Sequence, residues 1–440
     1  METKKKGFPA AFWVCACSEI FERLAYYLGR SLILIFVTAS VATGGLGLSD
    51  TVAANMQSNL TAFSYLLPLF GAVIVDKYIG ARYTTPVGMF IAAAGYFTGG
   101  IAKSATGVYV MIFLVSLGLA LFKNGAIIGR VITDKSQMDP AFSMRYTLVN
   151  VGAFIGTFLV GILYKDVFAK NGVLGFAPCF KMAALMMVLG GLWYIFVCWR
   201  FLGDLGKLPF KKTLTEEEKA AEAKKKEETG TKQPLTTIEK KRIGAIFVAS
   251  LFSIIFWIFW YLGYMPVYFY WAENMDWVVA GYQVPSTWFD AANSLFCVIL
   301  GPVTAALWKK LAARPQGDMS LFRKTGLGIA IIGVGYLFYA AIDIMRGGEK
   351  ASVLWLIVFA FLLTMGEMFF SPLGHSFISK YSPSRYLAVM MSVWGFATFI
   401  AAKSYGPVYG LLFGGKIEFK VACIGVAVVS FAAALIMIAL

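Results

Sequence analysis

Residues 10–38 read AAFWVCACSEIFERLAYYLGRSLILIFVT, an apolar run that contains four charged side chains. About 20 apolar residues in a helix suffice to cross a bilayer, and a charge at its centre costs about 2.5–3.5 kcal/mol. The polar residues of this run recur at the spacing of one helix face and form a single stripe: Glu19, Glu22, Arg23, Tyr26, Tyr27 and Arg30. We predict that the stripe lines a functional cavity in a helical bundle. The alternative is a neutral salt-bridge network that only joins helices.

The composition of the whole chain is that of an integral membrane protein. Of its 440 residues, 59% are hydrophobic and 14% are charged, whereas soluble proteins have roughly 25% charged residues. Apolar runs of this length without strict alternation argue against a β-barrel, and the composition excludes a soluble enzyme or a disordered chain. The net charge of +15 lies mainly in short loops, which indicates membrane topology rather than a nucleic-acid partner. The sequence contains no motif for a metal or another cofactor. The six cysteines are expected to be buried apolar residues.

Twelve apolar segments are long enough to be transmembrane helices, which predicts an all-α membrane protein. They cover residues 10–38, 51–75, 82–102, 106–132, 141–165, 177–201, 243–270, 286–311, 321–345, 352–379, 386–412 and 419–440.

The loop at residues 203–242 divides these segments into six and six. It holds 19 of the 63 charged residues, and we interpret it as a cytoplasmic linker between six-helix bundles at 1–202 and 243–440. Its middle, residues 215–226, could form a solvated helix with Glu–Lys pairs. Lys and Arg are concentrated in this loop and in the others on the same side, so we expect both termini to be cytoplasmic.

Two further charges of opposite sign lie in apolar surroundings, one in each half. Lys123 follows a long apolar run, and Glu367 lies within another. They could close one side of a cavity or form a permanent structural bridge. Lys403 is expected near an outer helix end, where it could reach the membrane surface. The lone histidine, His375, is expected to pack rather than titrate.

Several motifs resemble a known family. Residues 71–82, GAVIVDKYIGAR, resemble the G-x-x-x-D-R/K-x-G-R loop of the major facilitator superfamily, and residues 301–310 keep its glycine and basic residues. Residues 19–27, EIFERLAYY, resemble the E-x-x-E-R-F-x-Y-Y signature of proton-coupled oligopeptide transporters, the POT or PTR2 family. Further matches follow in the family's order: YLLP at 65–68 with Gly71, LFK at 121–123, YTLVNVG at 146–152, WFDAAN at 288–293, GEMFFSPLG at 366–374 and MMSVW at 390–394.

This resemblance implies the major facilitator fold and uptake of di- and tripeptides with protons. It implies proton coupling by Glu19, Glu22, Arg23, Lys123 and Glu367. It also implies that Arg30 and Lys123 hold the peptide carboxylate, and that Glu367 meets its amino group. The other implied substrate-binding residues are Tyr26, Tyr27, Tyr65, Tyr146, Asn150, Asn293, Ser371 and Trp394.

The chain departs from the family pattern in several places. The seventh helix usually carries an acidic residue and Gln after Phe-Trp, whereas residues 256–262, FWIFWYL, have neither. The usual outer partner of Arg30 is therefore missing, and Asp290 is a possible substitute acid. The two extra helices of many bacterial members are replaced by the 203–242 loop alone. Other departures are Asn124 in place of Pro, Arg145 in place of an aromatic residue and His375 in place of an apolar residue.

We therefore predict a symporter that imports di- and tripeptides by alternating access. The alternatives are a transporter of the same fold for nitrate, a drug-like compound or a modified amino acid, and, from a different class, a peptide sensor or a channel. The partners are small peptides, protons and membrane lipid, the driving force is a proton gradient, and the functional unit is a monomer in the cell membrane. No enzymatic activity is expected.

Overall fold

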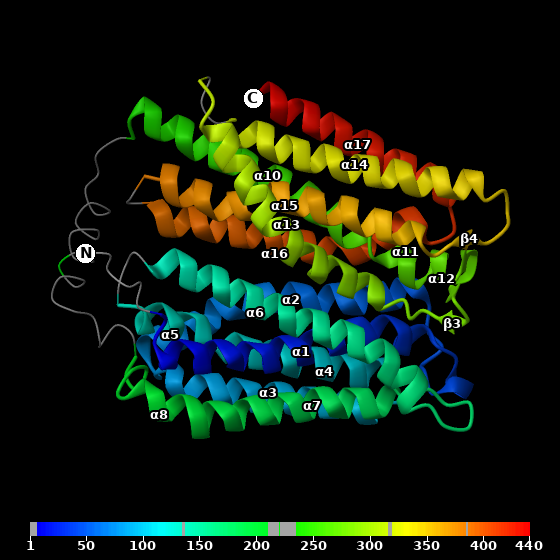
Figure 1. Cartoon of the computed structure of the whole chain (residues 1–440), viewed down its shortest axis with the longest axis horizontal. Coiled ribbons are helices and arrows are strands. Elements are labelled where there is room, and N and C mark those ends of the chain that lie inside the picture. The colour runs from blue at the N-terminus through cyan, green and yellow to red at the C-terminus, as the bar shows by residue number, and fades with distance from the viewer. Residues whose placement is uncertain (1–6, 134–136, 210–219, 221–234, 316–318, 384–385) are drawn as a thin grey trace. The chain divides into compact units, whose positions relative to one another are not determined.

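The computed structural model describes residues 7–133, 137–209, 220, 235–315, 319–383 and 386–440. Long helices occupy all twelve predicted places (Figure 1). In the described part of the chain, eight helical stretches are long and apolar enough to span a membrane. The long helices are α1 (Ala10–Thr38), α2 (Asp50–Lys77), α3 (Ala81–Ile101), α4 (Ala105–Leu121), α6 (Met138–Ile162), α7 (Phe176–Trp193), α10 (Thr237–Leu262), α13 (Trp288–Ala312), α14 (Leu321–Met345), α15 (Trp355–Tyr381), α16 (Leu387–Phe413) and α17 (Phe419–Ala439).

The chain forms two compact units. The first comprises Met1–Leu48 and Phe63–Leu214, and the second comprises Ser49–Ala62 and Thr215–Leu440. The start of α2 therefore groups with the second unit. Most of the 203–242 loop, including all but one residue of the possible helix at 215–226, lies outside the described residues. The bundle boundaries at 202 and 243 stay a prediction.

In the first unit, α1 packs on α6 and α7, and α3 packs on α4 and α7. Glycines allow the close approach of α6 to α1. A Cβ atom at Gly156 would lie 2.5 Å from the Leu24 carbonyl oxygen, and one at Gly152 would lie 2.9 Å from the Ile20 carbonyl oxygen. Small residues at such interfaces let helix backbones pack closely. This packing brings the polar stripe of α1 against α6.

The segment predicted as one helix over 106–132 is interrupted. Helix α4 ends at Leu121, and α5 (Asn124–Val131) begins three residues later. Lys123 leaves the helical conformation with φ −116° and ψ 31°, and its backbone N–H donates to Oγ1 of Thr85 at 3.4 Å. The following Asn-Gly pair has low helix propensity. The break places Lys123 in a turn rather than on a helix face.

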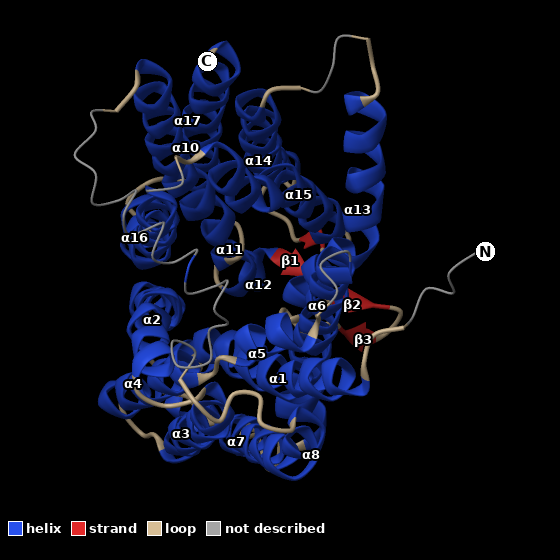
Figure 2. Ribbon diagram, turned by 90° about the vertical axis from the view of Figure 1, so that its left-hand side faces the viewer, coloured by secondary structure: helices blue, strands red, loops and turns tan. Residues whose placement is uncertain are grey.

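In the second unit, α14 packs on α15 and α17, α10 packs on α16, and α13 packs on α15. Figure 2 shows α16 of this unit nearly end-on. The first residues of α2 pack on α16, where Ser58 Oγ donates to the Ala402 carbonyl oxygen at 2.7 Å. A Cβ atom at Gly406 of α16 would lie 2.9 Å from the Ala54 carbonyl oxygen, so this contact also depends on a small residue.

Short elements complete the fold. A π-helical turn, η3 (Leu163–Val167), extends α6; the turns η4 (Tyr194–Cys198) and α8 (Trp199–Leu202) extend α7; η1 (Val41–Thr43) follows α1. After α10 come α11 (Met265–Tyr268) and α12 (Tyr270–Asn274). Strand β1 (Met275–Asp276) pairs in parallel with β4 (Ala351–Ser352), and β2 (Val278–Val279) pairs antiparallel with β3 (Tyr282–Gln283).

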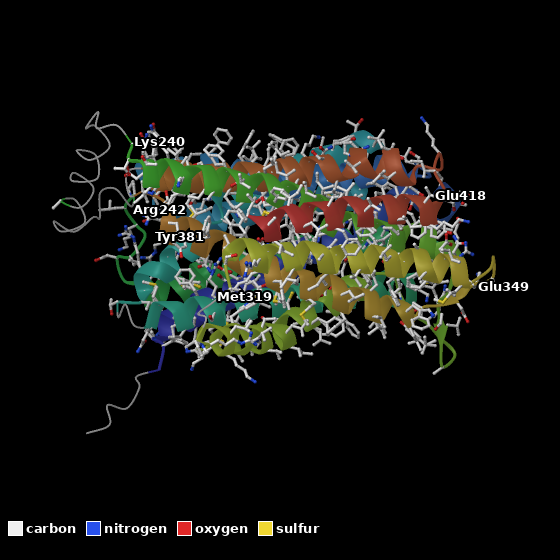
Figure 3. All side chains as sticks on the ribbon, turned by 90° about the horizontal axis from the view of Figure 1, so that it is seen from above. Lys240, Arg242, Met319, Glu349, Tyr381 and Glu418 are labelled. Atoms are coloured by element: carbon white, nitrogen blue, oxygen red, sulfur yellow. The ribbon has the colours of Figure 1, made fainter. Side chains whose placement is uncertain are left out.

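Charged residues lie at both ends of the long helices of the second unit. Lys240 and Arg242 lie at one end of its helices, whereas Glu349 and Glu418 lie at the other (Figure 3). The exposed surface between these ends includes many large apolar side chains, among them Leu411, Leu435 and Val428. A surface of this kind is suited to lipid.

Candidate functional site

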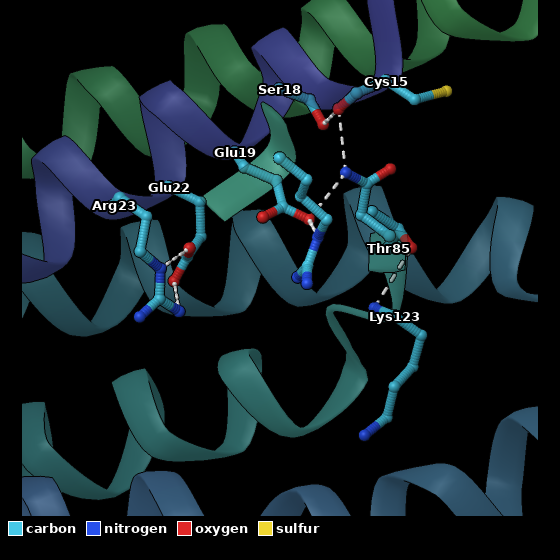
Figure 4. Close-up of polar contacts among 9 residues, drawn as sticks. Cys15, Ser18, Glu19, Glu22, Arg23, Thr85 and Lys123 are labelled. Atoms are coloured by element: carbon cyan, nitrogen blue, oxygen red, sulfur yellow. Dashed lines mark hydrogen bonds and ion pairs between the residues drawn. The ribbon is translucent and has the colours of Figure 1, made fainter. Parts of the chain in front are cut away.

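The polar stripe of α1 contains an ion pair between consecutive residues. Nη2 of Arg23 donates to Oε1 of Glu22 at 2.8 Å, and Nε of Arg23 donates to the other carboxylate oxygen (Figure 4). The Glu22 side chain is 1% exposed. The pair is bidentate, which is the favourable geometry for a guanidinium and a carboxylate. The pairing neutralises the carboxylate where it is buried.

The other carboxylate of the stripe, that of Glu19, finds its cation on a different helix. Nε of Arg145 in α6 donates to Oε1 of Glu19 at 2.7 Å. Nδ2 of Asn124, at the start of α5, donates to the same oxygen at 3.1 Å and to the Cys15 carbonyl oxygen at 2.8 Å. Glu19 of α1 thus accepts hydrogen bonds from residues of both α5 and α6.

Lys123 is not paired with either carboxylate of the stripe. Its Nζ donates to the backbone carbonyl oxygen of Pro68 in α2 at 2.7 Å. This hydrogen-bond partner is a polar but uncharged group.

The rest of the predicted residues of the first unit lie on three helices. Arg30 is buried, and its guanidinium lies 6.0 Å from the ring centroid of Tyr27. Tyr26 contacts Tyr27 edge-on, with 5.4 Å between ring centroids. Tyr65 of α2 and Tyr146 of α6 are exposed. Asn150 lies one turn beyond Tyr146 and donates to its carbonyl oxygen at 3.0 Å.

The second unit brings Glu367 of α15 against α13. Nδ2 of Asn293 donates to Oε2 of Glu367 at 3.2 Å and to Oγ1 of Thr364 at 2.8 Å. Sγ of Cys297 lies 3.8 Å from the same carboxylate oxygen. Glu367 is 9% exposed. Among the described residues of this unit, no Lys or Arg forms an ion pair with it.

Trp394 of α16 packs tightly on α15. Its ring is stacked on Phe370 with 6.2 Å between centroids, and a Cβ atom at Gly374 would lie 2.1 Å from its Cζ2. Ser371, the remaining predicted contact, is half-buried in α15.

Aromatic rings of α10 pack on α15 and α16. Phe256 stacks on Phe370 with centroids 4.0 Å apart, and Tyr261 stacks on Tyr405 with centroids 4.8 Å apart. Asp290 of α13 is buried and accepts a 2.5 Å hydrogen bond from Oη of Tyr268. The buried hydrogen bond to Tyr268 is consistent with a structural role for Asp290 in this unit. Whether Asp290 takes the place of the missing acid of the seventh helix stays a prediction.

Sequence reasoning missed three contributors to these contacts. Arg145 and Asn124 were noted only as departures from the family pattern, and Thr364 was not noted at all. No metal-binding cluster of His, Cys, Asp or Glu occurs among the residues that the structure describes. The side chain of His375 lies outside the description.

The helical fold matches that of solved POT family transporters. A solved structure of a POT family transporter in complex with 5-aminolevulinic acid matches with a TM-score of 0.86 at 24% identity, covering 99% of this chain and 97% of that chain. Another, of peptide transporter POT in complex with sulfate, matches with a TM-score of 0.85 at 22% identity, covering 99% and 96%.

The sequence comparisons lead to the family. The sequence model described as "PTR2: POT family" matches residues 203–413. The "Uncharacterized transporter YclF" of Bacillus subtilis is 25% identical over 90% of this chain and 87% of its own length. The "Di-/tripeptide transporter" of Lactococcus lactis subsp. cremoris is 24% identical over 88% and 86%. The resemblance to the POT family that the motifs predicted is confirmed.

Proposed function

We propose that this protein is a symporter that imports di- and tripeptides together with protons by alternating access. The proposal rests mainly on the hydrogen-bond partners of two charged side chains, Lys123 and Glu367. Lys123 contacts a backbone carbonyl, and Glu367 contacts a side-chain amide. The hydrogen bonds of both side chains are to uncharged groups of their own unit. A zwitterionic peptide presents one carboxylate and one amino group, which are the complementary charges.

The roles of individual residues follow from this chemistry. Lys123 and Arg30 would hold the peptide carboxylate, and Glu367 the amino group with help from Asn293. The tyrosines at 26, 27, 65 and 146, together with Asn150, Ser371 and Trp394, would contact the peptide. Proton coupling would involve Glu19, Glu22, Arg23, Lys123 and Glu367, because a proton on a buried carboxylate weakens its bond to a basic partner. No cofactor is needed for this cycle.

The names of similar proteins support peptides as the transported substrate. Similar proteins are named di-/tripeptide transporters in Lactococcus lactis and a peptide transporter in Yersinia enterocolitica. The retained Glu-x-x-Glu-Arg motif favours peptides. The second candidate is a small solute that resembles an amino acid, since a POT family structure holds 5-aminolevulinic acid.

The test is uptake of labelled dialanine into liposomes that contain the purified protein. Saturable uptake that depends on an inward proton gradient and is collapsed by a protonophore is expected. Absence of uptake across a di- and tripeptide panel would contradict the proposal. A ligand-induced thermal-shift screen with peptides and 5-aminolevulinic acid would distinguish the two candidates.

The proposed setting is the cell membrane, with a monomer surrounded by lipid as the functional unit and both termini in the cytoplasm. Its support is the basic end of the second unit at Lys240 and Arg242 (Figure 3), because basic residues are retained on the cytoplasmic side. In Lys240→Cys, the new thiol should react with a membrane-impermeant reagent only after the cells are opened.

A further inference from the structure

We propose that Trp260 of α10 is a further substrate-binding residue: its indole N–H donates to the first carbonyl oxygen of a bound peptide, next to the amino group that Glu367 would meet. This inference rests on the proposed function, which gives Glu367 its part in binding. It adds a donor from residues 256–262, the segment that departs from the family pattern. Its main support is a buried indole nitrogen that lies beside the Glu367 carboxylate and has no hydrogen bond to the described residues.

The packing of α10 on α15 places the two residues next to each other. The rings of Phe256 and Phe370 are stacked with 4.0 Å between centroids. The start of α10 and the end of α15 lie at the same end of the unit, so the two helices run in opposite directions (Figure 3). Trp260 is one helical turn after Phe256, and Glu367 is one turn before Phe370. Both turns lead away from the stack in the same direction, which brings the indole to the carboxylate.

Neighbouring aromatic rings hold the indole of Trp260 in place. The ring of Tyr264 is tilted against it at 4.8 Å between centroids, and that of Trp257 meets it edge-on at 5.4 Å. Trp260 is only 7% exposed. The indole nitrogen can only donate a hydrogen bond, and buried polar groups nearly always have a partner. A buried donor that bonds to none of the described residues therefore indicates a partner that comes from outside the chain.

The carboxylate of Glu367 is approached from two helices. On the side of α13, Nδ2 of Asn293 lies 3.2 Å from Oε2, and Sγ of Cys297 lies 3.8 Å from the same oxygen. The indole of Trp260 comes from α10. An amino group that binds this carboxylate therefore comes close to the indole N–H as well.

The chemistry of the ligand follows from this proximity. In a peptide, three covalent bonds separate the amino nitrogen from the first carbonyl oxygen, a distance of about 3 Å. An amino group at Glu367 thus places this oxygen within reach of an adjacent donor. The ligand class is a compound whose amino group is one carbon away from a carbonyl group. Di- and tripeptides belong to this class, and so does 5-aminolevulinic acid, which a POT family structure holds.

The test compares dialanine with its thioxo analogue, in which sulfur replaces the oxygen of the peptide carbonyl and accepts hydrogen bonds more weakly. Binding to the purified full-length protein is measured by calorimetry in the parent and in Trp260→Phe, which keeps an aromatic ring but removes the N–H. The parent should bind dialanine about fivefold more tightly than the analogue, and Trp260→Phe should bind both equally. Trp355→Phe, at an exposed position at the start of α15, is the matched control and should keep the preference of the parent.

A spectroscopic readout in the parent covers the case in which Trp260→Phe does not fold. Ultraviolet resonance Raman spectra report the hydrogen bonding of indole N–H groups, of which the chain has 11. Dialanine should convert one of them from unbonded to bonded, and the thioxo analogue should cause a smaller shift. An unchanged indole band with bound dialanine, or equal losses of affinity for the two ligands in Trp260→Phe, would overturn the inference and leave Trp260 a packing role.

Alaninamide separates this inference from the proposed function, because it has the amino group and the carbonyl but no carboxylate. If the parent transports no peptide, the proposed function fails, whereas binding of alaninamide that weakens about fivefold in Trp260→Phe still supports the role of Trp260. If the parent and Trp260→Phe bind and transport dialanine equally well, the proposed function stands and the inference fails. If the parent binds neither dialanine nor alaninamide, both fail.

Discussion

The ammonium nitrogen of Lys123 lies 2.7 Å from the backbone carbonyl oxygen of Pro68 and donates a hydrogen bond to it. This contact is possible because the chain leaves the helical conformation at Lys123, between α4 and α5. An ammonium held by a carbonyl is positioned but not neutralised. It is therefore prepared for an anionic group of a ligand.

Lys123→Gln should weaken binding of peptides that have a free carboxyl terminus. A hydrogen bond to a charged group contributes about 1.5–3 kcal/mol, which corresponds to roughly a 10- to 100-fold rise in the half-saturating concentration. Exchange of dialanine between the two sides of liposomes measures it. Lys103→Gln, at an exposed position outside the helices, is the matched control. A similar loss for peptides with an amidated carboxyl terminus would speak against a carboxylate contact.

Glu367→Gln should discriminate between peptides by their amino terminus. Glutamine keeps the size of the side chain and an oxygen that can accept from Asn293, but it removes the negative charge. We expect a loss of about 10- to 100-fold in affinity for free peptides and little change for N-acetylated peptides. Competition against labelled dialanine provides both values. Equal losses for the two series would mean that Glu367 does not meet the amino group.

Asn293→Leu should have a smaller effect than Glu367→Gln. Asn293 donates to the Glu367 carboxylate and to Thr364, and a neutral donor of this kind contributes about 1 kcal/mol, or roughly fivefold in affinity. The half-saturating concentration for exchange should rise by that factor with the maximal rate preserved. A loss as large as that of Glu367→Gln would show that Asn293 binds the peptide more strongly than it supports Glu367.

Glu22→Gln should uncouple transport from the proton gradient. Its amide oxygen can still accept from Arg23, but the side chain can no longer take up and release a proton. Gradient-driven accumulation of dialanine should fall to background while exchange without a gradient continues. Driven uptake at the parent rate would remove Glu22 from proton coupling.

Gly374→Ala should destabilise the protein because α15 and Trp394 leave no room for a methyl group. The added Cβ atom would lie 2.1 Å from Cζ2 of Trp394, and overpacking of this kind costs about 1–3 kcal/mol. Thermal unfolding in detergent measures the loss. Gly395→Ala, whose Cβ atom would meet nothing within 4 Å, should be neutral or stabilising. Equal unfolding temperatures for the two variants would contradict the packing argument.

Hydropathy and helical spacing were sufficient to predict much of this molecule. The stripe from Glu19 to Arg30 needed only the 3.6-residue period, and in the structure Glu19, Glu22, Tyr26 and Arg30 are all buried on α1. The twelve helices follow from the length of apolar runs, since a bilayer sets that length.

The partners of the charged groups could not be predicted in the same way. The break at Lys123 occurs within a continuous apolar run, so hydropathy does not detect it. The contact between Glu19 and Arg145 joins residues 126 positions apart, and it depends on the glycines that bring α6 against α1. Arg145 was visible as a departure from the family, but only the packing of the helices shows which carboxylate it binds.

The ion pairs Glu22–Arg23 and Glu19–Arg145 differ in how they are connected. Glu22 and Arg23 are neighbours on the same helix, α1. When this helix slides or tilts, both side chains move together and the distance between them does not change. Glu19 lies on α1 and Arg145 on α6, so the same displacement lengthens the distance between their side chains. The Glu22–Arg23 contact is therefore insensitive to movement of α1 against α6, whereas the Glu19–Arg145 contact changes with that movement.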